Sequence, residues 1–393
     1  MAGGPQPGDE PSLPFGFGHL ELNDLLRMLQ ASGPVNWEIA TQVATHVATD
    51  GEAEPPVDPA AAEQLDELAR AAQTHVVAET GLAATFAAPV RSFGRRGWAE
   101  LHLEALRPVL EALAATLGGA FGGGGEPIGA GAPGDPLAAI LPMLAPLLLG
   151  VQAGSMIGYL AQHALGRYDL PLPAADEPSL CFVVPNLDAF EAAWSLERAD
   201  LRFTVALHEV VHAAVRSVPW VRERLVGLAT DYVSAYEVDP TVLGSRLGHV
   251  DPADPESLQQ LAERPEELLG AMTSPRQAEL LATLRRFHAV LDGYGDEVLR
   301  RIGDRLVPSF DRVHEALARH RLERGEATRF VEQLLGVTLE RDDYEAGAAF
   351  CAGVVDRAGP DALNRLWEAP SFTPTPSELA APGLWLARIE LDL

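Results

Sequence analysis

The residues best suited to chemistry are two histidines four positions apart, with a glutamate directly after the first. His208, Glu209 and His212 form the pattern His-Glu-x-x-His. On a helix, residues four apart differ by about 40° around the axis, so both imidazoles point the same way and can hold Zn²⁺ at about 2.0–2.1 Å. Glu209 lies beside the open coordination position, where it can take a proton from a metal-bound water. The pattern predicts a zinc site with Glu209 as general base.

The flanks of this pattern predict a buried helix. Asp200 can cap its start, Pro219 lies just past its end, and the residues at 205–207 and 210–214 are apolar around the motif. Two histidines and a glutamate inside an apolar helix are costly to bury without a partner, and a metal ion supplies one. The alternative is a purely structural role, with the imidazoles satisfied inside the core.

A catalytic zinc needs a third protein ligand and an open position for water. A second helix is expected over 221–236, and its acidic candidates are Asp231, Glu237 and Glu223. Asp231 is the first choice because small and apolar neighbours would let its helix approach the motif helix closely. Glu237, Glu223 and the absence of a third protein ligand stay open as alternatives.

Composition limits the class of partner. The chain has 393 residues, 47% of them hydrophobic, which is enough for a large core or two domains. Its net charge of −27 argues against nucleic acid and anionic membrane surfaces as partners. The two cysteines, Cys181 and Cys351, are too few for a disulfide framework or a cysteine-based zinc site. A cytoplasmic protein acting on a peptide or small amide substrate fits these limits.

The organisation along the chain predicts a mainly α fold with minor β-strand content. Residues 1–15 read as a disordered N-terminus without a signal peptide, 16–135 as an N-terminal helical region, and 136–393 as the region that carries the metal site. The boundary at 136 follows a glycine-rich loop, and one continuous domain is the alternative. The clearest strand candidate is 180–184.

The stretch 136–165 is the most apolar part of the chain. Its length permits a membrane span, but Pro142, Pro146 and Gly150 interrupt it, and a basic anchor is present only at Arg167. Two buried helices are therefore expected here rather than a span. The small residues Gly150, Ala153, Gly154 and Gly158 should allow a neighbouring helix to pack closely.

The spacing of the predicted ligands is similar to that of gluzincin metallopeptidases of the leukotriene-hydrolase and aminopeptidase type. Eighteen residues separate His212 from Asp231, where that family has glutamate, one methylene longer. A further similarity is Tyr344-Glu-Ala-Gly, which resembles a stretch whose tyrosine stabilises the transition state. The resemblance implies this role for Tyr344; a tyrosine that only packs between helices is the alternative.

Over most of its length the chain resembles the actinobacterial zincin-like metallopeptidase type 2 family. The similarity rests on the His208 motif and on stretches at 33–37, 169–173, 186–194, 219–220, 363–367, 374–375 and 385–386. This resemblance implies a helical zincin-like metallopeptidase core that binds Zn²⁺ and hydrolyses a peptide or related amide bond. The rival class is a non-enzymatic metal-binding scaffold that retains the helix pair. Glu209 favours the enzyme, because a structural zinc site does not need it.

Overall fold

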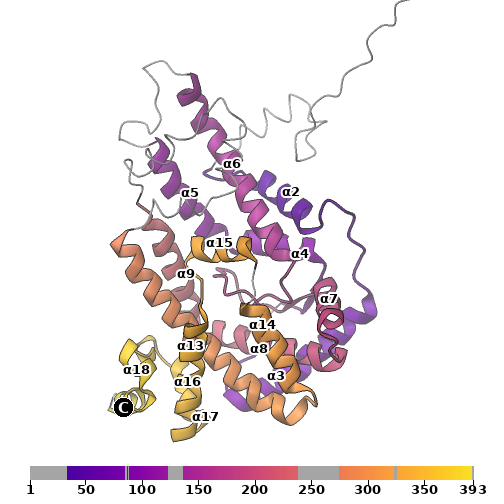
Figure 1. Cartoon of the computed structure of the whole chain (residues 1–393), viewed down its shortest axis with the longest axis vertical. Helices are drawn as coiled ribbons and strands as arrows, with labels where there is room; N and C mark the ends of the chain where they lie inside the picture. Colours follow the sequence, from indigo (N-terminus) through magenta and orange to yellow (C-terminus); the bar gives the residue numbers. More distant parts are fainter. Residues whose placement is uncertain are drawn as a thin grey trace, which may run out of the picture.

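The computed structural model describes residues 33–84, 86, 88–122, 136–237, 274–322 and 325–391. The predicted disordered segment 1–15 lies outside these residues. The first half contains α2 (Trp37–Ala48), α3 (Pro59–Thr80), β1 (Arg91–Phe93), α4 (Arg95–Ala105), α5 (Arg107–Gly122), α6 (Pro136–Ala161), β2 (Cys181–Val183) and α7 (Val184–Trp194). The mainly α fold with minor strand content is therefore confirmed (Figure 1).

The second half begins with the helix pair that the motif predicts. It contains α8 (Arg198–Arg216), α9 (Pro219–Ser234), α13 (Pro275–Leu306), α14 (Phe310–Leu322), α15 (Glu326–Leu335), α16 (Arg341–Ala358), α17 (Pro360–Asn364), η1 (Arg365–Trp367), η2 (Pro370–Phe372), α18 (Pro376–Ala380) and α19 (Pro382–Leu391). Side chains and proline set several of these starts. Asn36, Asp58 and Ser274 accept backbone N–H groups at the beginnings of α2, α3 and α13, and a proline follows Asp58 and Ser274 directly.

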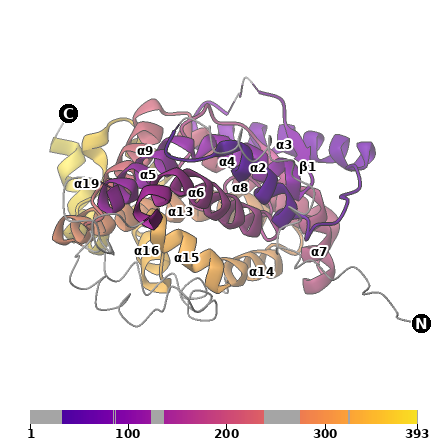
Figure 2. The same cartoon turned by 90° about the horizontal axis from the view of Figure 1, so that it is seen from above.

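The region 136–165 forms one helix instead of the expected two, because α6 continues through Pro142 and Pro146. Along its far half, Gly150, Gly154 and Gly158 lie directly on the backbone of α2, so the predicted close packing is confirmed. Figures 1 and 2 show the two helices side by side.

Among the described residues, none of the helices has the length and apolar character that a bilayer crossing requires.

The strands form a short parallel pair, in which Arg91 is opposite Cys181 and Phe93 is opposite Val183. The expected strand at 180–184 is confirmed at its centre. Phe182 also bridges to Gly166, which brings the segment 165–169 next to the sheet. This segment contacts the motif helix and takes part in the candidate site.

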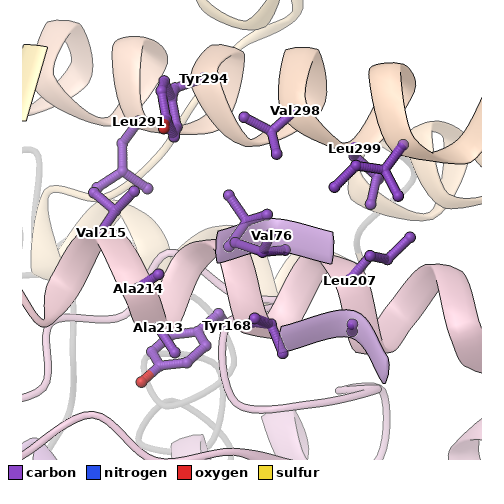
Figure 3. Close-up of a cluster of buried hydrophobic side chains, with 14 of the residues drawn as sticks. Val76, Tyr168, Leu207, Ala213, Ala214, Val215, Leu291, Tyr294, Val298 and Leu299 are labelled. Carbon is purple, nitrogen blue, oxygen red and sulfur yellow. The ribbon is translucent and has the colours of Figure 1, made fainter. Parts of the chain in front are cut away.

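The core around α8 is built from both halves of the chain. Apolar side chains from α3, the 165–169 segment, α8 and α13 meet there, among them Val76, Tyr168, Leu207 and Leu299 (Figure 3). The helices α8 and α13 pack directly on each other, and α3 covers α8 as well. The N-terminal helices therefore help to hold the motif helix in place. The domain boundary at 136 stays a prediction.

Candidate metal centre

The motif lies in the middle of α8, where the structure brings its two histidines together. The ring centroids of His208 and His212 are 4.3 Å apart. The His212 side chain is buried, and that of His208 is 14% exposed, so one imidazole is reachable from a cavity while the other is in the core. This is the arrangement that the four-residue spacing predicts for a helix.

The acid that approaches this pair comes from α13. Asp292 Oδ1 is 3.9 Å from His212 Nε2, and the Asp292 side chain is mostly buried. Gly295 makes the approach possible, because a Cβ at this position would lie 2.8 Å from His212 Nε2. Burial raises the pKa of Asp292; the charge of Asp296 adds to this rise, and the charge of Arg321 opposes it. We call His208, His212 and Asp292 the α8–α13 site.

The two ring nitrogens of His212 have different environments. Nδ1 accepts a hydrogen bond from the Arg216 guanidinium at 2.9 Å, whereas Nε2 is buried and has no hydrogen-bond partner. Burial holds the pKa of His212 well below its usual value, and His208 and Arg216 lower it further. The ring is therefore neutral at pH 7. Because an arginine only donates, the ring proton is on Nε2, the nitrogen nearer to Asp292.

Glu209 is fully buried and anchors a loop. Its Oε2 accepts the backbone N–H of Arg167 at 2.7 Å, and its Oε1 accepts that of Tyr168 at 2.9 Å. Gly166 completes the contact, because a Cβ there would lie 2.5 Å from the Glu209 carboxyl carbon. The same Oε1 is 3.6 Å from His208 Nδ1. Each carboxylate oxygen keeps a second lone pair, so the anchoring role leaves Glu209 able to accept one more hydrogen.

His208 and Glu209 line a cavity of about 20 Å³, enough for a water molecule. Its apolar walls come from Leu165, Val205, Leu299 and Leu317. Its polar lining consists of Asp169, His208, Glu209, His314 and Arg321. We call this cavity the His208 pocket. The His208 pocket can thus hold a water molecule beside His208 and Glu209.

The helix α14 provides His314 and Arg321, which the sequence did not single out. From the sequence alone, His314-Glu315 repeats the start of the motif, but His320 is six residues after His314 and lies across the helix, so a solvated helix face is expected. This expectation is wrong for His314 and His320. His314 Nε2 is buried without a hydrogen-bond partner, and His320 pairs with Asp169 at 3.3 Å. The reason is that α14 packs on α8 and turns this side of its surface towards the pocket.

The sequence-predicted third ligands lie elsewhere. Asp231, Glu237 and Glu223 are all exposed, on α9 or just after it. Tyr344 lies closer, because the Arg321 guanidinium is over its ring at 5.8 Å, but it does not line the His208 pocket. The structure therefore brings together His208, Glu209 and His212, and does not bring Asp231 to them.

The α8–α13 site fits zinc by the type of its donors. Two imidazoles and one carboxylate form a usual ligand set, and the buried, unpartnered Nε2 of His212 faces Asp292. Across the part of the chain that the structure describes, no three His, Cys, Asp or Glu side chains already stand in a metal-holding arrangement. Binding would therefore require side-chain rotation and loss of the proton from His212 Nε2.

Asp292 had a signal in the sequence, although not a motif. It follows the apolar run 289–291 inside a helix and precedes Gly293, with Gly295 two positions further on. An acid surrounded by apolar and small residues on a helix is expensive to bury, which is the criterion that favoured Asp231. Applied to the whole chain, this criterion would also have selected Asp292.

The comparisons with known proteins agree with this architecture. The family model described as zincin-like metallopeptidase matches residues 35–386, and the chain belongs to this family. A solved structure from Chloroflexus aurantiacus, described as a "putative hydrolase with a novel fold", aligns with a TM-score of 0.64 at 25% identity. The alignment covers 91% of this chain and 99% of the other. A search of curated proteins gave no match.

Proposed function

We propose that this chain is a zinc-dependent hydrolase that cleaves a peptide or related amide bond at the α8–α13 site. The observation that carries the proposal is the buried Nε2 of His212, which has no hydrogen-bond partner and lies 3.9 Å from Asp292. His208, His212 and Asp292 would hold the ion. When bound, zinc supplies a Lewis acid and lowers the pKa of a coordinated water. Family membership and the related structure support the same class.

The remaining residues of the His208 pocket have tasks that their positions suggest. Glu209 Oε1 lies next to His208 and is the group that would accept a proton. His314 and Arg321 are the donors that could hold a substrate carbonyl oxygen. Arg321 is positioned by Asp296, whose two carboxylate oxygens accept its hydrogen bonds at 3.0 and 3.2 Å. The apolar walls keep bulk water away from these groups.

The second candidate is a metal-binding scaffold without turnover, and one observation favours it. Glu209 is fully buried and both of its oxygens already accept backbone N–H groups, so the residue has a structural task of its own. In this reading the motif holds the 165–169 segment against α8. The two candidates share the metal site and differ only in hydrolysis.

Zinc binding tests the ligand set directly. The full chain, freed of metal, is titrated with zinc in competition with a chromophoric chelator, alongside His208→Ala, Asp292→Ala and Asp231→Ala. We expect the first two substitutions to weaken binding by more than about 100-fold, because removing a ligand costs at least as much as removing the group that orients one. Asp231→Ala is the matched control and should bind like the wild type. An unchanged Asp292→Ala, or a wild type that takes up no zinc, would contradict the proposal.

A further inference from the structure

A second small cavity lies at the C-terminal end of α8, and three arginines are among the residues that line it. Arg167, Arg216 and Arg222 line it together with Tyr168 and Asp176. Its volume is about 10 Å³, which is room for one group of the size of a water molecule. We call it the arginine cavity.

Two of the three arginines have carboxylate partners. Arg167 pairs with Asp176 at 2.5 Å, and Arg222 pairs with Glu177 at 2.8 Å. Arg216 is 5% exposed, and among the described residues no carboxylate lies within ion-pair distance of it. Arg216 is therefore the one guanidinium in this wall without an ion-pair partner among the described residues, because Asp292 and Glu209 act on its charge only from beyond ion-pair distance.

The contacts of Arg216 compensate this charge only in part. Its guanidinium donates to His212 Nδ1 at 2.9 Å and to the His212 carbonyl at 3.3 Å, and it lies over the Tyr168 ring at 4.9 Å. A helix C-terminus and an aromatic ring both attract a cation, but neither carries a full negative charge. A guanidinium removed from water without a counter-ion is expensive.

We infer that the arginine cavity binds a small monovalent anion of chloride size, held by Arg216 with Arg167 and Arg222 beside it. The volume favours a monoatomic ion over a carboxylate or a phosphate, which need more space than one water molecule occupies. The ion would supply the missing negative charge at Arg216. Carboxylates already neutralise the other two arginines, so one monovalent anion balances the wall.

The position of Arg216 links this anion to the metal, a step that rests on the proposed function. While Arg216 donates to His212 Nδ1, the ring proton stays on Nε2, the nitrogen that zinc needs. An anion gives the guanidinium another partner, and Nδ1 can then carry the ring proton. Anion and zinc should therefore strengthen each other's binding, and thermodynamic linkage makes the effect reciprocal.

The first experiment uses metal-free protein and measures thermal unfolding. The full chain is unfolded in sodium chloride and in sodium gluconate at equal ionic strength, since gluconate is too large for the cavity. Chloride should raise Tm by about 1 °C or more over gluconate, because a ligand that binds only the folded state stabilises it. Equal Tm values in the two salts would overturn the anion site. This measurement does not depend on zinc.

Two variants assign the effect to Arg216. Arg216→Met should lose the difference between chloride and gluconate, while Arg198→Met, an exposed arginine on the same helix, should keep it. If Arg216→Met does not fold, crystals of the wild type grown in sodium bromide decide the question. An anomalous peak beside Arg216 supports the site, and a bromide-grown structure without one overturns it.

The linkage needs a separate readout. Zinc affinity of the wild type should be about 5-fold higher or more in chloride than in gluconate. Arg216→Met should bind zinc equally in both salts. If chloride raises Tm but the protein binds no zinc, the anion site stands and the proposed function fails. If zinc binds with equal affinity in both salts, the proposed function stands and the linkage is wrong.

Discussion

Several helix contacts in this protein depend on glycine, and two of them differ in what the glycine approaches. At α2–α6, three glycines one turn apart lie on backbone carbonyls, where a Cβ would come within 2.4–2.6 Å (Gly150 on Asn36, Gly154 on Ala40, Gly158 on Ala44). At α8–α13, Gly295 lies instead on a side-chain nitrogen, His212 Nε2. The first contact joins two backbones, and the second brings ionisable side chains together.

The surroundings of the two contacts differ in the same way. His102, on α4 beside α2 and α6, has a carbonyl partner for each ring nitrogen, from Trp98 and Arg167. At α8–α13, both nitrogens of His288 and the Nε2 of His212 are buried without hydrogen-bond partners. Each such group costs about 1–3 kcal/mol. The α8–α13 contact therefore holds three buried ring nitrogens without partners, whereas both ring nitrogens of His102 lie within hydrogen-bond distance of a carbonyl oxygen.

The largest effect is expected for Glu209→Gln, on the same helix, α8, as His208 and His212. The substitution removes the proton acceptor, and hydrolysis should fall by about 10²–10⁴. The structure adds a second effect, because the amide nitrogen must face the backbone N–H of Arg167 or Tyr168 and leave it unpaired, at about 1–3 kcal/mol. A peptide-library assay and urea denaturation measure the two losses.

The exposed residue Glu63, substituted to glutamine, is the matched control and should change neither quantity. Loss of stability with unchanged cleavage would mean that Glu209 is structural, which is the scaffold reading. Loss of cleavage at full stability would mean that the two backbone hydrogen bonds contribute little.

The second-largest effect is expected at the α2–α6 contact. Gly154→Ala places a Cβ 2.4 Å from the Ala40 carbonyl oxygen, and backbone cannot move aside cheaply. Forcing α6 away from α2 should cost about 1–3 kcal/mol of folding free energy, measured by chemical denaturation. Gly227→Ala is the control, because a Cβ there meets nothing within 4 Å. That variant should gain up to about 1 kcal/mol from helix propensity. Equal stability of the two variants would contradict the close contact.

These two contacts also show what the sequence could predict. The glycines of α6 repeat every four residues within one apolar stretch, so their packing role is local information and was predicted correctly. The failure of the two-helix prediction in the same stretch has a physical reason. α6 keeps helical form through Pro142 and Pro146, and packing on α2 outweighs the local preference of proline to end a helix.

At the α8–α13 contact, the sequence predicts the histidine pair but not the acid that approaches it. His208 and His212 follow from one turn of helix, but Asp292 is 80 positions further on, and its pairing depends on how α13 crosses α8. Periodicity within a segment carries no information on that crossing. The anchoring of Glu209 by Arg167 and Tyr168 has the same origin, because a loop 41 positions earlier donates the hydrogen bonds.

Stability should depend on pH through His102, whose two ring nitrogens both face carbonyl oxygens. Burial, aided by the charge of Arg167, lowers the pKa of His102 to about 4, while an unfolded histidine titrates near 6.5. Above pH 6.5 both states are neutral and its full contribution is present. As the pH falls towards 4 the unfolded state binds a proton that the folded state refuses, and stability drops by about 1 kcal/mol for each pH unit.

The measurement is urea denaturation at pH 7.5 and 5.5 for wild type and His102→Gln. The variant should be less stable at pH 7.5, and its deficit should shrink by about 1 kcal/mol at pH 5.5 because glutamine does not titrate. A constant deficit would show that the two carbonyl acceptors, from Trp98 and Arg167, keep His102 protonated in the folded protein in spite of its burial.

The smallest effect is expected for Tyr344→Phe. From the resemblance, this hydroxyl is predicted to stabilise an oxyanion, which would be worth about 10²–10³ in rate. Its ring, however, lies under Arg321, and the residue is not among those lining the His208 pocket. We therefore expect kcat/KM to fall by less than about 10-fold, because phenylalanine keeps the ring that supports the guanidinium. Tyr344→Leu removes the ring and should cost more than Tyr344→Phe, since Arg321 loses a contact that orients it. A 100-fold loss of kcat/KM in Tyr344→Phe would show instead that the hydroxyl takes part in catalysis. The active site would then include α16 as well as α8, α13 and α14.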